Sequence, residues 1–126
     1  MNDINIKGTV KTPAISFCET EKRLVIEGRS TLENPARFYK PLISKLKDFN
    51  NGSIERLEID FKLEYFNTTS SLVILDVLKH LQSLNAPDNE VVINWYYDEE
   101  DEDLLEIGQD YSTMLNFPFN LVVNPN

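Results

Sequence analysis

The clearest pattern of hydrophobic and polar positions in the chain runs from residue 57 to residue 84. Apolar and polar side chains alternate from Leu57 to Tyr65, and this period of two is typical of a strand with one buried face. Further along, apolar residues recur at the spacing of one helix face, at Ile74, Val77, Leu78, Leu81 and Leu84. The segment between them consists of residues that often cap helices, namely Asn67, Thr68, Thr69, Ser70 and Ser71. We therefore predict a strand, a hydroxyl-rich turn that precedes a helix, and the amphipathic helix itself.

The N-terminal half predicts a hairpin and a helix. Residues 1–11 are polar, and we expect them to be loosely held. Two strands, Ala14–Cys18 and Leu24–Glu27, flank a polar turn, and Gly28 is expected to end the second strand. A helix should start with Asn34 as its cap and Pro35 as its first residue. Its apolar stripe comprises Phe38, Leu42 and Leu46, with Tyr39, Ile43 and Phe49 beside them. We expect it to end near Asn50-Asn51-Gly52 and to be bent or broken at Pro41.

The C-terminal part predicts a strand over Val91–Tyr97, a short helix over Leu104–Leu115 that Gly108 interrupts, and an edge strand over Phe119–Val123. The resulting order is β-β-α-β-α-β-α-β. A doubly wound sheet has apolar strands covered on both faces, whereas the strand from Leu57 to Tyr65 has one polar face. We therefore predict a two-layer α/β fold, with a mixed β-sheet and helices mainly on one face, formed as a single domain over residues 1–126.

Composition and charge narrow the function classes. The formal net charge of −9 argues against binding to nucleic acid or to an anionic membrane, because both would repel this surface. No apolar run approaches the roughly 20 residues that span a bilayer, and the first residues do not resemble a secretion signal. The single cysteine, Cys18, cannot form an internal disulfide, which favours the reducing cytoplasm. We expect a cytoplasmic protein whose partners are proteins.

Candidate catalytic and metal-binding chemistry is sparse. The only histidine, His80, falls among polar residues of the predicted helix and has no nucleophile at a suggestive spacing. The chain has no glycine-rich phosphate loop and no cysteine–histidine cluster for zinc, so we predict no cofactor, no metal and no catalytic residue. The acidic run Asp98–Asp103 could bind a hard cation, but it lacks the ligand pattern of an EF-hand. An exposed loop that enters a helix explains it better, since acidic residues are favoured at a helix N-terminus.

The hydroxyl cluster is the strongest candidate site. Thr68, Thr69, Ser70 and Ser71 stand where a helix begins, and a helix start offers backbone N–H donors and positive potential to a phosphate. A phosphate there adds about −1.5 to −2 charges and would disfavour an interface that tolerates the bare hydroxyl. From these residues alone, plain capping remains the simpler interpretation.

Four segments of the chain resemble the SiaC family of bacterial regulatory phosphoproteins. They are Lys11–Phe17, Gly28–Asn34, Tyr65–Ser71, and Trp95–Tyr97 followed by Asp101–Asp103 and Glu106–Gly108. The resemblance covers nearly the whole chain in the right order. It departs from the family pattern at Leu32, where a proline is expected before Glu33-Asn34, and this affects the detail of that loop.

The resemblance implies a STAS-like fold, as in anti-sigma-factor antagonists, and a partner switch. In the family, a kinase of the anti-sigma-factor type phosphorylates a threonine in the turn, and a PP2C-like phosphatase removes the phosphate. The unphosphorylated protein binds a diguanylate cyclase and stimulates synthesis of cyclic di-GMP, which promotes biofilm formation. The matching threonine is Thr68, with Thr69 as second choice, and Asn67, Thr69, Ser70 and Ser71 would shape the turn that the partners bind.

Two other functions stay open at the level of the sequence. One is an anti-sigma-factor antagonist that acts on transcription, which differs from the cyclase regulator only in its downstream partner. The other is a small hydrolase or cation-binding protein that uses the acidic run Asp98–Asp103. The first prediction remains a protein without enzymatic activity that phosphorylation switches.

Overall fold

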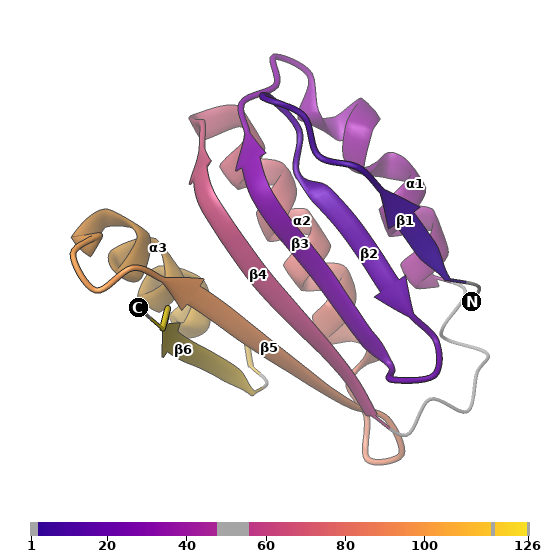
Figure 1. Cartoon of the computed structure of the whole chain (residues 1–126). Coiled ribbons are helices and arrows are strands. Elements are labelled where there is room, and N and C mark those ends of the chain that lie inside the picture. Colours follow the sequence, from indigo (N-terminus) through magenta and orange to yellow (C-terminus); the bar gives the residue numbers. More distant parts are fainter. Residues whose placement is uncertain (1–2, 48–55, 117, 126) are drawn as a thin grey trace.

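A mixed β-sheet with three helices forms the protein, shown in Figure 1 as a computed structural model that describes residues 3–47, 56–116 and 118–125. The strands are β1 (Ile4–Ile6), β2 (Ala14–Cys18), β3 (Arg23–Ser30), β4 (Arg56–Phe66), β5 (Glu90–Tyr97) and β6 (Phe119–Val123). The helices are α1 (Pro35–Lys47), α2 (Thr68–Leu84) and α3 (Glu102–Met114). Within the described residues, no helix combines the length and apolar content that crossing a bilayer requires.

The strands lie side by side in the order in which they occur in the sequence. β1, β2 and β3 pair antiparallel, whereas β3, β4, β5 and β6 run parallel to one another. Each parallel connection passes through one helix and moves one strand further across the sheet. Because such crossovers are almost always right-handed, three crossovers in one direction place their helices on the same face. Figure 1 shows all three helices behind the sheet, which confirms the predicted fold class.

The core fills the space between the sheet and the helices. From β4, Leu57, Ile59, Phe61 and Leu63 point into it, and α2 contributes the apolar stripe predicted from the sequence. Trp95 of β5 is almost fully buried beneath α3, and its indole N–H donates to the carbonyl of Leu104 at 3.1 Å. A Cβ atom on Gly108 would lie 2.5 Å from the Trp95 ring. Gly108 therefore lets α3 approach the indole, and the predicted interruption there is wrong because α3 runs through it unbroken.

Two predictions about the first strands are also wrong. Residues 4–6, expected to be loosely held, form β1 and pair with β2, with Ile4 buried. β3 does not end at Gly28 but continues to Ser30 across a bulge, where Gly28 faces Leu63 and Arg29 faces Tyr65. Gly28 has φ of +119°, a conformation that favours glycine, so it marks the bulge and not the end of the strand.

The same bulge changes which residues of β4 are buried. Glu64 is the extra residue on β4, so the alternation of buried and exposed side chains shifts by one position after it. Tyr65, predicted to lie on the buried face, is 51% exposed, and Phe66 is buried in its place. The bulge therefore sets the orientation of the last residues before the hydroxyl cluster.

α1 begins at Pro35, as predicted, and remains one helix through Pro41. The predicted break is wrong because Pro41 lies on the exposed side, while Tyr39, Leu42 and Leu46 hold both parts of the helix against the core. The predicted contribution of Phe49 and the predicted helix end at residues 50–52 lie outside the described residues. The C-terminal strand β6 is confirmed at an edge of the sheet.

The carboxyl ends of the four parallel strands meet at one edge of the sheet, which we call the carboxyl edge. α2 starts there one residue after β4, and α3 starts there after the loop that follows β5. Ligand and partner sites of parallel α/β sheets are usually formed at this edge. The predicted site lies on it.

Candidate functional site

The hydroxyl cluster forms the first turn of α2, so it belongs to the helix and does not precede it as predicted. Asn67 is the N-cap, and its Oδ1 accepts a hydrogen bond from the Ser70 amide at 2.9 Å. Its Nδ2 donates to the carbonyl of Leu32 at 3.0 Å. Asn67 thus satisfies a helix amide and also joins α2 to the loop after β3.

The two threonines of this turn are both exposed, but their hydroxyls differ. Thr69 Oγ1 lies 3.1 Å from the Leu32 carbonyl and 3.2 Å from Asn67 Oδ1, so its proton is shared with these acceptors. The Thr68 hydroxyl forms no hydrogen bond with any other described residue. A partner can therefore approach Thr68 without first breaking a side-chain hydrogen bond.

The two serines of the turn connect it to the flanking helices. Ser70 is fully buried, and its Oγ accepts from Ser30 Oγ at 2.9 Å, which in turn accepts from the hydroxyl of Tyr39 in α1 at 2.9 Å. On the other side, the hydroxyl of Tyr111 in α3 donates to the Ser71 carbonyl at 2.8 Å. Two tyrosines from α1 and α3 thus hold the first turn of α2 in place.

Burial changes the acidity of both tyrosines. Loss of solvent raises the pKa of Tyr39, and the hydrogen bond to Ser30 lowers it to a smaller degree. Loss of solvent also raises the pKa of Tyr111 to about 12, against the smaller effect of its bond to Ser71. Both phenols are therefore neutral donors at physiological pH.

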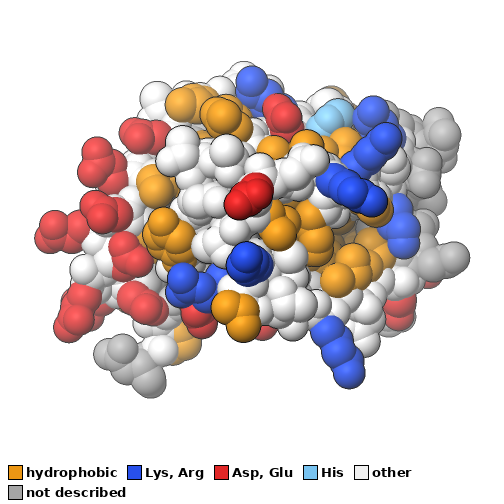
Figure 2. All heavy atoms as spheres, turned by 90° about the horizontal axis from the view of Figure 1, so that it is seen from above, with side chains coloured by type: hydrophobic (Ala, Val, Ile, Leu, Met, Phe, Trp, Pro, Cys, Tyr) orange, Lys and Arg blue, Asp and Glu red, His pale blue; other side chains and the backbone are white. Residues whose placement is uncertain are grey.

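The acidic run lies beside this turn, at the start of α3. Asp101 caps α3 by accepting from the Leu104 amide at 3.0 Å, and Glu102 and Asp103 lie in the first helical turn. This confirms the prediction of an acidic loop that enters a helix. Among the described residues, no group of three or more His, Cys, Asp and Glu side chains is arranged to hold a metal ion. Figure 2, which looks down on the carboxyl edge, shows acidic side chains gathered on the side of α3 and basic ones on the side of α1.

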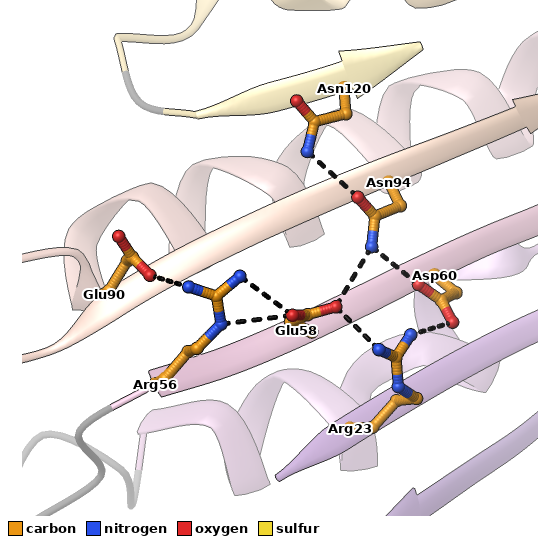
Figure 3. Close-up of polar contacts among 7 residues, drawn as sticks. All are labelled: Arg23, Arg56, Glu58, Asp60, Glu90, Asn94 and Asn120. Atoms are coloured by element: carbon orange, nitrogen blue, oxygen red, sulfur yellow. Dashed lines mark hydrogen bonds and ion pairs between the residues drawn. The ribbon is translucent and has the colours of Figure 1, made fainter. Parts of the chain in front are cut away.

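A second polar cluster covers the open face of the sheet, away from the hydroxyl cluster (Figure 3). Arg23 Nη2 and Nη1 donate to Glu58 at 2.7 Å and to Asp60, and Asn94 Nδ2 donates to Asp60 at 2.9 Å. Hydrogen bonds from Arg56 and attraction to both arginines lower the pKa of Glu58, while its partial burial opposes them. The bond to Asp60 raises the pKa of Arg23. These carboxylates are neutralised by partners, so the cluster stabilises strand pairing and offers no free acid–base pair.

The family model for SiaC family regulatory phosphoproteins matches residues 6–124 of this chain. The chain belongs to the SiaC family. An uncharacterized protein of Pseudomonas aeruginosa (strain UCBPP-PA14) is 31% identical over 119 residues, which is 94% of each chain. The family assignment confirms the resemblance predicted from four sequence segments.

Solved structures of family members share this fold. The crystal structure of apo-SiaC from Pseudomonas aeruginosa has a TM-score of 0.86 at 30% identity, over 97% of this chain and 99% of that one. SiaC in the crystal structure of the diguanylate cyclase SiaD in complex with its activator SiaC, also from P. aeruginosa, has a TM-score of 0.80 at 30% identity, over 97% and 100% of the two chains. The specific likeness to STAS domains stays a prediction.

The structure thus places Asn67, Thr68, Thr69, Ser70 and Ser71 together in one turn, although Ser70 is buried and supports the turn from below. The turn is also held from outside the motif, by Ser30, Tyr39 and Tyr111, and no pattern in the sequence predicted their role. The segment Gly28–Asn34, already noted for its resemblance to the family, contains Ser30 and was the one available signal.

Proposed function

We propose that this chain is a phosphorylation-switched regulator, whose unphosphorylated form binds and activates a diguanylate cyclase. The observation that supports it most is the exposed Thr68 hydroxyl, which makes no side-chain hydrogen bond with the described residues and lies at the N-terminus of α2. The family description and the solved complex of SiaC with SiaD support the type of partner. The chain itself acts as a single domain without catalytic activity, and we place it in the cytoplasm, where cyclic di-GMP would connect it to biofilm formation.

The modification is a phosphoryl transfer to Thr68 Oγ1. A kinase of the anti-sigma-factor type aligns this oxygen with the γ-phosphorus of ATP, so that the new O–P bond forms as the bond to the ADP oxygen breaks. A base of the kinase takes the hydroxyl proton. A PP2C-like phosphatase returns the free hydroxyl by hydrolysis. Thr69 is the poorer acceptor because its hydroxyl would first give up its contacts with Leu32 and Asn67.

The phosphate changes an interface that the bare hydroxyl tolerates. The dianion is favoured by the N-terminal end of α2 in the free protein, but burying it under a partner requires its desolvation. A loss of about 3–4 kcal/mol would weaken the complex by a few hundredfold, which is enough for a switch. Tyr39, through Ser30, and Tyr111 hold the turn by hydrogen bonds, so we expect charge and not refolding to produce this effect.

The modification is tested by incubating the protein with its cognate kinase and ATP, followed by peptide mass spectrometry. Thr68→Val should abolish phosphorylation, whereas Thr69→Val, the matched control, should retain it. Valine removes the hydroxyl at nearly constant volume, so both variants should fold. Phosphate on another residue, or none at all, contradicts the assignment of Thr68.

The switch is tested by titrating the cyclase with this protein and following cyclic di-GMP synthesis. Unmodified protein should stimulate the cyclase, while phosphorylated protein and Thr68→Asp should bind it more weakly, by about a few hundredfold for the phosphorylated form. Thr69→Asp provides a control that adds the same charge one residue away. Equal stimulation by all four forms would show that Thr68 does not control the complex.

A further inference from the structure

We propose that a groove beside Thr68, between the end of β4 and α3, docks a basic segment of the cyclase that also presents an apolar side chain. This rests on the proposed function, because the cyclase is the partner named there. The groove has a volume of about 540 Å³ and combines an apolar floor with an acidic rim. Its occupant must match both.

The floor of the groove is formed by the last residues of β4 and by one side of α3. Tyr65, Phe66, Leu104 and Ile107 line it, and of these Tyr65 is the most open to solvent, at 51% exposed. Thr68 follows Phe66 by two residues, so a partner that enters the groove lies next to the switch residue. An apolar side chain of the partner can bury its surface against this floor.

The rim is negatively charged. Glu64, Asp103, Glu106 and Asp110 line it, and none of these four carboxylates forms an ion pair or a side-chain hydrogen bond with another described residue. Asp103, Glu106 and Asp110 are spaced by three and four residues on one helix, where like charges repel one another. Arg29 lies over the ring of Tyr65, a side chain of the groove, with its guanidinium carbon 5.3 Å from the ring centre. A partner that brings lysine or arginine would relieve the repulsion.

The negative charge of the rim determines which kinds of molecule can bind in the groove. Nucleotides, including the substrate and product of a cyclase, are anions, and the carboxylates of the rim disfavour them. A segment of the cyclase in which lysine or arginine flanks an apolar residue is attracted by the rim and fits the floor.

The groove and Thr68 then have separable roles. Charges at the rim of an interface mainly change the association rate and its dependence on salt, whereas groups in desolvated contact mainly change the dissociation rate. The acidic rim should therefore accelerate encounter with the cyclase. The Thr68 hydroxyl should determine how long the complex lasts.

The test measures association and dissociation rates of the cyclase with the unphosphorylated protein at about 50 and 300 mM salt, by biolayer interferometry. The groove variant is Glu106→Lys/Asp110→Lys, which reverses two exposed charges outside the first turn of α3. The control variant is Glu19→Lys/Glu21→Lys, in the turn between β2 and β3 at the opposite end of the sheet. Both variants carry the same net charge. Circular dichroism checks that both variants are folded. A third variant, Glu106→Gln/Asp110→Asn, removes the two charges of the groove variant at nearly constant side-chain size.

We expect the groove variant to lower the association rate about tenfold at the lower salt concentration and to abolish most of its salt dependence. The control variant should stay within about twofold of wild type. Equal association rates for the groove and control variants would overturn the docking site while the cyclase still binds, which leaves the proposed function intact. Failure of wild type to bind the cyclase would overturn both.

Discussion

At the scale of single residues, the hydroxyls of Thr68 and Thr69 differ in their hydrogen bonding, although they are neighbours in one turn. Both are exposed, yet among the described residues only the Thr69 hydroxyl has hydrogen-bond acceptors, the Leu32 carbonyl and Asn67 Oδ1. A hydroxyl that is already bonded resists transfer because its contact must be lost before the oxygen can attack. The neighbouring residue Asn67 caps the helix whose first turn contains both threonines.

Ser70 supports this turn from the interior, and we expect Ser70→Ala to destabilise the protein by about 1–3 kcal/mol. The substitution leaves the buried Ser30 hydroxyl without its acceptor, and an unsatisfied buried polar group is costly. Ser83→Ala is the matched control, because the exposed Ser83 hydroxyl donates to the carbonyl of His80 within the same helix. Once the hydroxyl is removed, this carbonyl can bond to water instead. The free energy of unfolding, measured with urea, should fall for the first variant and change little for the second. Similar losses of unfolding free energy for both variants would show that the buried hydroxyls of Tyr39, Ser30 and Ser70 stabilise the protein no more than an exposed hydroxyl does.

The sequence predicted the residues of this turn but not the residues that support it. Asn67 and the hydroxyls adjoin one another, so their local pattern was sufficient. Ser70 instead depends on Ser30, which is 40 residues away, and Ser71 depends on Tyr111 at the same separation. When a tyrosine occupies a core position, the sequence around it does not indicate which group its hydroxyl will bond to. Only the folded chain defines that partner.

At the scale of elements, the packing of α3 on Trp95 depends on the absence of a side chain at Gly108. We expect Gly108→Ala to destabilise the protein by about 1–3 kcal/mol, although alanine favours helices by about 1 kcal/mol. The new methyl group would approach the Trp95 ring and the Leu121 side chain within 3 Å, so α3 or the indole must move. Gln109→Ala, on the exposed side of the same helix, should be neutral or stabilising. Urea denaturation distinguishes the two, and a stabilised Gly108→Ala variant would contradict close packing at this point.

The contact between α3 and α2 through Tyr111 predicts a loss of stability at high pH. The pKa of Tyr111 is raised to about 12, so the folded protein keeps the phenol proton at pH values where the unfolded chain has lost it. The stabilisation present below pH 10 is therefore lost as the pH rises towards 12. Unfolding free energies measured from pH 8 to 11.5 should fall more steeply for wild type than for Tyr111→Phe. Tyr65→Phe is the control, since Tyr65 is exposed, and parallel curves for wild type and Tyr111→Phe would contradict this role.

Among the elements, long periodic segments were predictable and short or irregular ones were not. β4 and α2 have the length and spacing that determine their type, and their predictions are confirmed apart from their ends. β1 has three residues and one buried side chain, so its pairing with β2 leaves no periodic signal. The bulge near Gly28 depends on how β3 faces β4, and a single glycine predicts a strand end equally well.

At the scale of the whole molecule, charge is distributed unevenly across the layer of helices. α1 contains four basic residues and no acidic one, whereas α3 contains four acidic residues and no basic one. Figure 2 shows this separation from one side of the molecule to the other. The order of the strands produces it, because sequential crossovers place α1 and α3 at opposite ends of the helical layer with α2 between them.

This distribution predicts that salt stabilises the protein. The unpaired carboxylates of α3 and the net charge of −9 repel one another in the folded state, and salt screens this repulsion. Salt also weakens the ion pairs of the open face, but Arg23, Glu58 and Asp60 are in direct contact and partly buried, so they are screened less. The melting temperature at neutral pH should therefore rise by about 3 °C between roughly 20 and 500 mM NaCl. Glu106→Lys/Asp110→Lys should rise less than Glu19→Lys/Glu21→Lys, although the two variants have equal net charge. If the melting temperatures of the two variants respond alike to salt, the total charge alone governs the stabilisation. The carboxylates of α3 would then repel one another no more than those elsewhere on the surface.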